Sequence, residues 1–96
     1  MGVSQPAHYG EEWSDERIKG YLDRKAEADD NPDFHALMMA YKHMRAHDFE
    51  RFIGFFLAAG RDINARGRDG LTLLEIAQRH AKSAEFVKIL EAAQAR

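Results

Sequence analysis

Apolar positions recur at helical spacing from residue 14 onwards, and the first such stretch predicts a short helix over 14–24. Ile18, Tyr21 and Leu22 fall on one face of that helix. Ser14 stands where its hydroxyl can cap the first turn, and Gly20 weakens the middle of the helix.

Two apolar stretches in the middle of the chain predict a helical hairpin. Asn31 and Pro32 suit the start of a helix over 32–45. After a short break at "AHD", Asp48 is the expected cap of a second helix, over 49–59. The two apolar stripes are Phe34, Leu37, Met38, Tyr41 and Met44, then Phe49, Phe52, Ile53 and Phe56.

A second hairpin is predicted over 72–94. Thr72 and Glu75 have the spacing of a capping box, which marks the start of a helix. Ser83 is the expected cap of the last helix, 84–94. No stretch alternates with the period of two that a half-buried strand requires, so the predicted fold is all-α.

The polar stretches between these helices divide the chain. Residues 1–12 are polar, with Gly2, Pro6 and Gly10, and we expect a disordered or loosely held N-terminus. Residues 25–31 form an acidic linker. A length of 96 residues fits one domain, so residues 13–96 are predicted to form a single helical domain.

The segment "FFLAAGRDINARGRDGLTLLEIA", residues 55–77, resembles the end of one ankyrin repeat, its projecting loop and the start of the next. Leu73 replaces the family's proline and Glu75 its histidine, and "AEFVKIL" at 84–90 is similar to the following second helix. The resemblance implies two stacked ankyrin-like helical hairpins and a role in protein binding. Such stacks usually need at least ~3 repeats, so the helix over 14–24 is expected to cap the stack.

The residues from "EEWSDERIKGYL" through "DFHALMMAYKHMRAHDFERFIGFF" are also similar to a small family of short proteobacterial proteins of unknown function. That second resemblance implies no activity.

The charge distribution argues against a nucleic-acid partner. The formal net charge is −2, with −5 over residues 1–33 and +3 over residues 34–96, and no concentrated basic face emerges. Cysteine is absent, so neither disulfides nor thiolate metal sites can form. No apolar run approaches the ~18–20 residues of a membrane span, and no signal peptide is recognisable. We therefore expect a cytoplasmic monomer.

Candidate catalytic chemistry is sparse. His43 and His47 are separated by four residues, a spacing that can chelate a metal ion, but no convergent third ligand is evident. Ser14 and Ser83 already have capping roles. The sequence thus predicts no catalytic residue, cofactor or metal, and a small metal-binding protein or enzyme using the two histidines is the weakest alternative.

The predicted function is a small non-enzymatic protein–protein interaction module. Candidate partner contacts are Arg61, Arg66 and Arg68, which cluster between the hairpins, and Met39 and Phe55, which lie off the apolar stripes of their helices. The last two either form an exposed apolar patch or are buried under the N-terminal helix. In a further alternative, the chain is a nucleic-acid-associated protein, and the three arginines bind phosphate groups.

Overall fold

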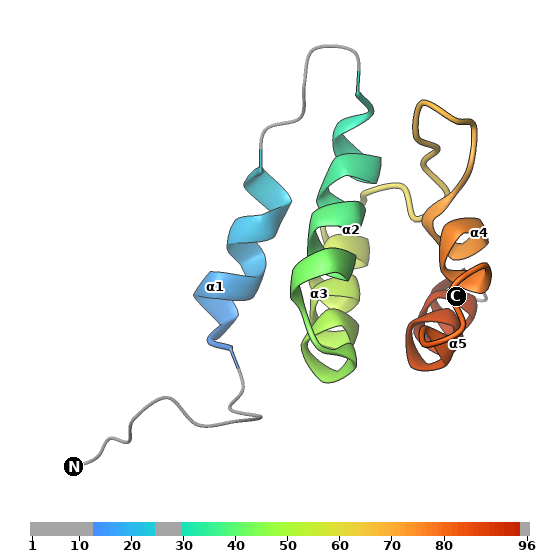
Figure 1. Cartoon of the computed structure of the whole chain (residues 1–96). Helices are drawn as coiled ribbons and strands as arrows, with labels where there is room; N and C mark the ends of the chain where they lie inside the picture. Colours follow the sequence, from blue (N-terminus) through green and yellow to red (C-terminus); the bar gives the residue numbers. More distant parts are fainter. Residues whose placement is uncertain (1–12, 25–29, 95–96) are drawn as a thin grey trace.

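Helices stack in three layers in a computed structural model of the chain (Figure 1), which describes residues 13–24 and 30–94. The described residues contain no β-strand, so their fold is all-α as predicted. The predicted loose terminus, 1–12, lies outside the described residues, as does most of the predicted linker. The elements are α1 (Asp15–Lys19), the 3-10 helix η1 (Gly20–Asp23), α2 (Pro32–His43), α3 (Ala46–Ala58), α4 (Leu73–Gln78) and α5 (Ala84–Gln94).

The middle layer, α2 and α3, is covered on both sides. On one side α1 contacts α3 and η1 contacts α2; on the other side α2 meets α4 and α3 meets α5. This position explains why α2 buries the small residues Ala36 and Ala40 completely. Of the predicted apolar stripe, Leu37 and Met44 are buried, and the others are half-buried. His43, on the same face one turn later, contacts Tyr21 of η1, so the small side chains face the first layer.

Most predicted helix starts are confirmed. Ser14 accepts a hydrogen bond from the Arg17 amide, and Asn31 accepts from the amides of the first turn of α2. Thr72 and Glu75 form the complete capping box. Ser83 directly precedes α5, but its hydroxyl contacts the Tyr41 hydroxyl at 2.5 Å, which ties α5 to the middle layer.

The predicted boundary between the two central helices is wrong. The helix expected over 32–45 ends at His43, and the helix expected over 49–59 starts at Ala46. Asp48 is therefore not a cap: it lies in the first turn of α3, 3% exposed, and accepts a hydrogen bond from Arg51. The N-cap is Arg45, whose backbone is extended, and Asp48 lies in the first turn, where the helix dipole favours an acidic side chain.

The first predicted helix, 14–24, is present in two parts. It is α-helical through Lys19 and continues as the 3-10 helix η1 from Gly20. Gly20 is the residue that sequence reasoning identified as the weak point, since glycine lowers helical stability. The tighter 3-10 turn keeps Ile18 and Tyr21 directed to the core, where both are buried.

Gly60 ends α3 in the manner predicted. Its φ of +75° is left-handed, a conformation that glycine adopts without steric cost. The Arg61 amide donates to the Phe56 carbonyl at 3.2 Å and the Gly60 amide to the Leu57 carbonyl at 2.9 Å. This is the Schellman pattern. It starts the α3–α4 loop, residues 59–72, which leads from the second layer to the third.

Candidate functional site

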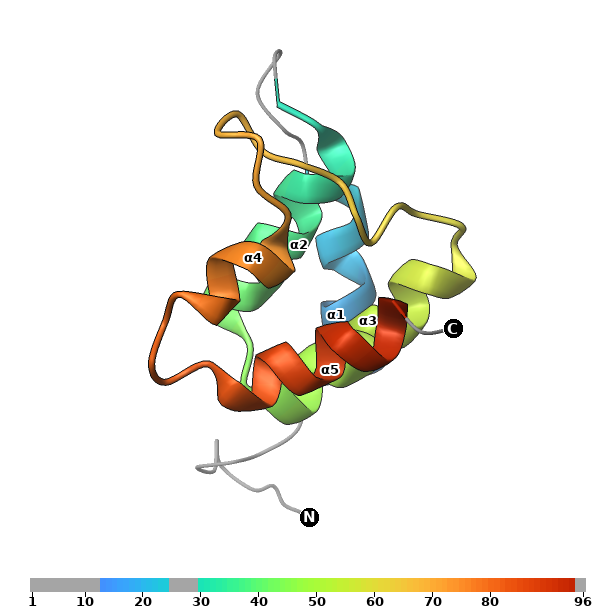
Figure 2. The same ribbon diagram turned by 90° about the vertical axis from the view of Figure 1, so that its right-hand side faces the viewer.

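A groove lies where α2, α4 and the α3–α4 loop meet, and we call it the α2–α4 groove. Figure 2 shows the loop crossing the N-terminal end of α2 before it enters α4. The groove has a volume of about 400 Å³. Its apolar residues are Phe34, Met38, Met39, Leu71 and Ile76, and its polar residues are Asp30, His35, Lys42, Arg68 and Asp69.

The apolar residues of the groove are all half-buried, so each presents part of its side chain to solvent. On α2, Phe34 and Met38 follow each other at four-residue spacing, as do His35 and Met39, so two adjacent helical rows line the groove. Sequence reasoning placed Phe34 and Met38 on the core stripe and did not recognise a groove. The sequence did contain a signal, because apolar residues occupy two adjacent rows of α2 rather than one. However, only the position of the α3–α4 loop shows that these rows line a groove.

Gly67 lets the α3–α4 loop close over Phe34. A Cβ atom at Gly67 would lie 2.6 Å from the Phe34 ring, which no real packing permits. The tip of the loop is fixed by hydrogen bonds from the Gly67 amide to Leu71 and from the Gly70 amide to Gly67. The absence of a side chain at residue 67 thus determines how closely the loop approaches α2.

We expect Gly67→Ala to lower the free energy of unfolding by about 1–3 kcal/mol, because the added methyl group must displace the Phe34 ring. Gly54→Ala is the matched control: a Cβ there meets nothing within 4 Å inside α3, and alanine should stabilise the helix by about 0.5–1 kcal/mol. Urea denaturation measures both. Equal effects of the two changes would contradict the proposed loop contact.

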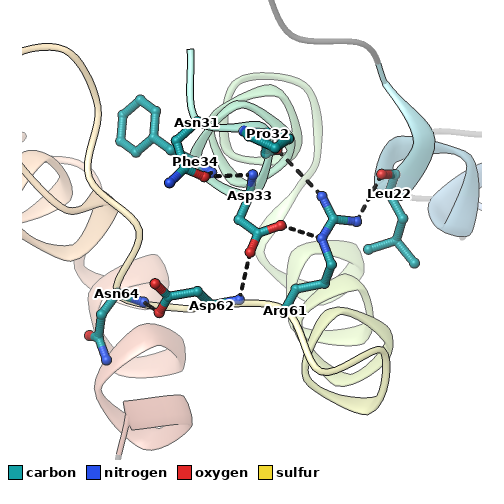
Figure 3. A network of polar contacts seen from close by, with 8 residues as sticks. All are labelled: Leu22, Asn31, Pro32, Asp33, Phe34, Arg61, Asp62 and Asn64. Carbon is teal, nitrogen blue, oxygen red and sulfur yellow. Dashed lines mark hydrogen bonds and ion pairs between the residues drawn. The ribbon is translucent and has the colours of Figure 1, made fainter. Parts of the chain in front are cut away.

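Arg61 anchors the start of the loop to the two preceding layers (Figure 3). Its guanidinium pairs with the Asp33 carboxylate and donates to the carbonyls of Leu22, at 2.9 Å, and Pro32, at 3.4 Å. The other oxygen of Asp33 accepts from the Asp62 amide at 2.9 Å. This arginine, predicted as a partner contact, therefore holds η1, α2 and the loop together.

The same contacts control the protonation of Asp33. Burial acts to raise the pKa of its carboxyl, but the hydrogen bonds from Arg61 and the Asp62 amide, with the charge of Arg61, lower it below the ordinary value of 3.8. A carboxyl with a lowered folded-state pKa stabilises the fold above its ordinary pKa. That contribution is lost as the pH falls through the folded-state value.

We accordingly expect Asp33→Asn to destabilise the protein by about 1.5–3 kcal/mol at neutral pH, the usual range for hydrogen bonds to charged groups. The difference from the unaltered protein should shrink below pH 4, since Asp33 is then increasingly protonated in both states. Melting temperatures between pH 2 and 7 test this, with the exposed Asp23→Asn as control. A difference that stays constant down to pH 2 would rule out the ionised pair as its cause.

The other two loop arginines also have acceptors within the chain. Arg66 donates to the Gly70 carbonyl at 2.7 Å and to Glu75 at 3.2 Å, and Arg68 pairs with Asp30 at 2.6 Å. Their side chains nevertheless remain 59% and 56% exposed, compared with 22% for Arg61. The three arginines thus do not form one cluster of equivalent cations: one is a structural anchor, and two lie at the surface of the loop.

The structure separates the two apolar candidates. Met39 lines the α2–α4 groove. Phe55 is half-buried on α3, with the Lys19 ammonium of α1 4.8 Å from the centre of its ring. Phe55 thus contacts the first layer, whereas Met39 lines the groove toward the third layer, so the structure gives the two residues different surroundings.

The two candidate histidines lie on different helices. His43 is the last residue of α2, and its Nδ1 atom forms a hydrogen bond of 3.2 Å with the Tyr21 hydroxyl. His47 lies in the first turn of α3. Within residues 13–24 and 30–94, no three His, Cys, Asp or Glu side chains gather closely enough to hold a metal ion. No helix in these ranges is long and apolar enough to cross a membrane.

A scan against protein-family models, a search of curated proteins and a search of solved structures each found no match to this chain.

Proposed function

We propose that this chain is a small, non-enzymatic protein–protein interaction module that binds a segment of its partner in the α2–α4 groove. The observation that carries the proposal is a half-buried apolar floor, open to solvent, beneath a charged rim. A partner side chain that entered this groove would remove the floor from water, which favours association.

The chemistry of the floor suits a peptide partner. Two of its side chains, Met38 and Met39, are methionines, whose flexible thioethers adapt to the shape of a ligand. The volume of about 400 Å³ is near the lower end of the roughly 300–1,000 Å³ typical of ligand pockets. It therefore fits a few side chains of a short segment rather than a whole helix face.

We further propose that α2–α3 and α4–α5 are two ankyrin-like hairpins stacked side by side, with α1 and η1 as the cap. Support comes from the contacts between equivalent helices of the two hairpins. The first helices, α2 and α4, contact each other, and so do the second helices, α3 and α5. In such a stack the first helices and the loops line one side, which is where the groove lies.

The contacts of the loop arginines favour a protein partner over a nucleic acid. Arg61, Arg66 and Arg68 each have an oxygen acceptor within the chain. A phosphate backbone would have to compete with these acceptors, so the loop lacks the unpaired cations on which nucleic-acid affinity depends.

Affinity purification of the full chain from its native cell tests the proposal, in parallel with two variants. Met39→Ser removes an apolar side chain from the groove, and Leu57→Ser removes a similarly half-buried side chain from α3, outside the groove. We expect a partner that the unaltered chain and the Leu57 variant retain and the Met39 variant loses. Circular dichroism verifies that both variants are folded.

Crosslinking then locates the contact. Crosslinks between the partner and α2 or the α3–α4 loop would support the groove as the binding surface. A partner that the Met39 variant retains, or binding that depends on RNA or DNA and falls steeply with salt, would refute the proposal.

A further inference from the structure

We propose that the occupant of the α2–α4 groove is an extended peptide segment with an acidic residue at one end, an apolar residue in the middle and a basic residue at the other end. This inference rests on the proposed function and specifies its ligand. The basis is the distribution of charge around the apolar floor.

One end of the groove carries an unpaired positive charge. Lys42 lies in the last turn of α2, is exposed, and has no ion pair with any other described residue. An acidic side chain of the ligand is the natural complement of this ammonium group.

At the opposite end, at the tip of the α3–α4 loop, the described charged residues that line the groove, Asp30, Arg68 and Asp69, sum to a negative charge. Asp30 and Arg68 neutralise each other through their contact at 2.6 Å. Asp69 is exposed and has no ion pair with a described residue, so its charge remains to be matched. A basic side chain of the ligand suits this end.

Helix geometry gives the length of the groove along α2, from the residue that the loop contacts to Lys42, and we use this length to space the two ligand charges. Phe34 lies against the loop at Gly67, and Lys42 follows eight residues later on α2. Eight residues of α-helix span about 12 Å at ~1.5 Å each. An extended peptide covers that length in about four residues at ~3.3 Å each, so ligand residues one, three and five face the groove and carry acid, apolar group and base.

The pentapeptide acetyl-Glu-Val-Leu-Thr-Lys-amide is the direct probe, titrated into the ¹⁵N-labelled full chain and followed by amide chemical shifts. Its controls are the versions with Glu at both ends, with Lys at both ends, and with Gly in place of the central Leu. We expect the largest shifts in α2, α4 and the α3–α4 loop, and a dissociation constant about two- to tenfold lower for the mixed-charge peptide than for either like-charged peptide.

Charge reversal in the protein makes the test specific. Lys42→Glu leaves two acidic ends, so the preference should change to the peptide with two lysines. Asp69→Lys leaves two basic ends, so the peptide with two glutamates should become the best ligand. Both residues are exposed, so neither variant should disturb the fold.

The outcomes distinguish this inference from the function on which it rests. If the chemical-shift changes of groove residues depend on the central Leu of the peptide but not on its end charges, the charge assignment is overturned, and the groove remains a peptide-binding site. Absence of shifts with every peptide at millimolar concentration overturns the inference, and the Met39→Ser purification then decides separately whether the groove binds a partner. Preferences that follow both charge reversals support the proposal.

Discussion

Phe52→Ala should cost about 3–5 kcal/mol of unfolding free energy, the usual result of truncating a buried phenylalanine. Phe52 is fully buried in the middle layer, with ring centres 6.4 Å from Phe49 and 5.7 Å from Phe56. Because α3 is covered by α1 on one side and α5 on the other, the neighbours cannot easily collapse into the space that the ring leaves.

Leu57→Ala is the control for this prediction, since Leu57 lies on the same helix but is only half-buried. Urea denaturation followed by circular dichroism gives both free energies. A loss below ~1 kcal/mol for Phe52→Ala is typical of surface positions and would mean that the face of α3 is misassigned.

Deletion of residues 1–30 should unfold the protein or drive it to self-associate. The deletion removes Ile18 and Tyr21 from the core and exposes the apolar surfaces of α2 and α3 that they cover. It also removes the Trp13 and Leu22 carbonyls that accept hydrogen bonds from Arg51 and Arg61. A domain of this size has only about 5–15 kcal/mol of total stability, so losses of this kind are large.

Two point variants separate the packing contribution from other effects of the deletion. Ile18→Ala should cost about 2–5 kcal/mol because Ile18 is fully buried, whereas Glu16→Ala, at an exposed position of the same helix, should change little. Analytical ultracentrifugation and thermal denaturation report association and stability. A shortened chain that stays monomeric with an unchanged Tm would identify α1 and η1 as an arm rather than a cap, and would make them the first candidate for partner binding.

Local signals in the sequence were sufficient to predict most helix starts. Ser14, Asn31 and Thr72 each lie next to the backbone amides that they cap, so the information is contained within three or four residues. The glycine termination of α3 has the same local origin. The capping box of α4 is an example in which spacing alone identifies both partners.

The candidate site could not be predicted in this way because its contacts join distant parts of the chain. Arg61 appeared to be one of three equivalent surface cations, but its acceptors lie 28 and 39 residues earlier. The groove likewise depends on where the loop meets α2, and no local pattern encodes the approach of Gly67 to Phe34. The capping propensity of Asp48 likewise suggested a helix start at this residue, whereas it lies buried in the first turn of α3 beside Arg51.

The bond between Arg61 and the Leu22 carbonyl has a consequence for synthesis of the protein. Leu22 leaves the ribosome 39 residues before Arg61 does. At translation rates of about 5–20 residues per second, the first layer waits roughly 2–8 seconds before its anchor exists. For much of that interval α2 and α3 are still incomplete, so the apolar side chains of α1 and η1 are open to chaperones that bind nascent chains.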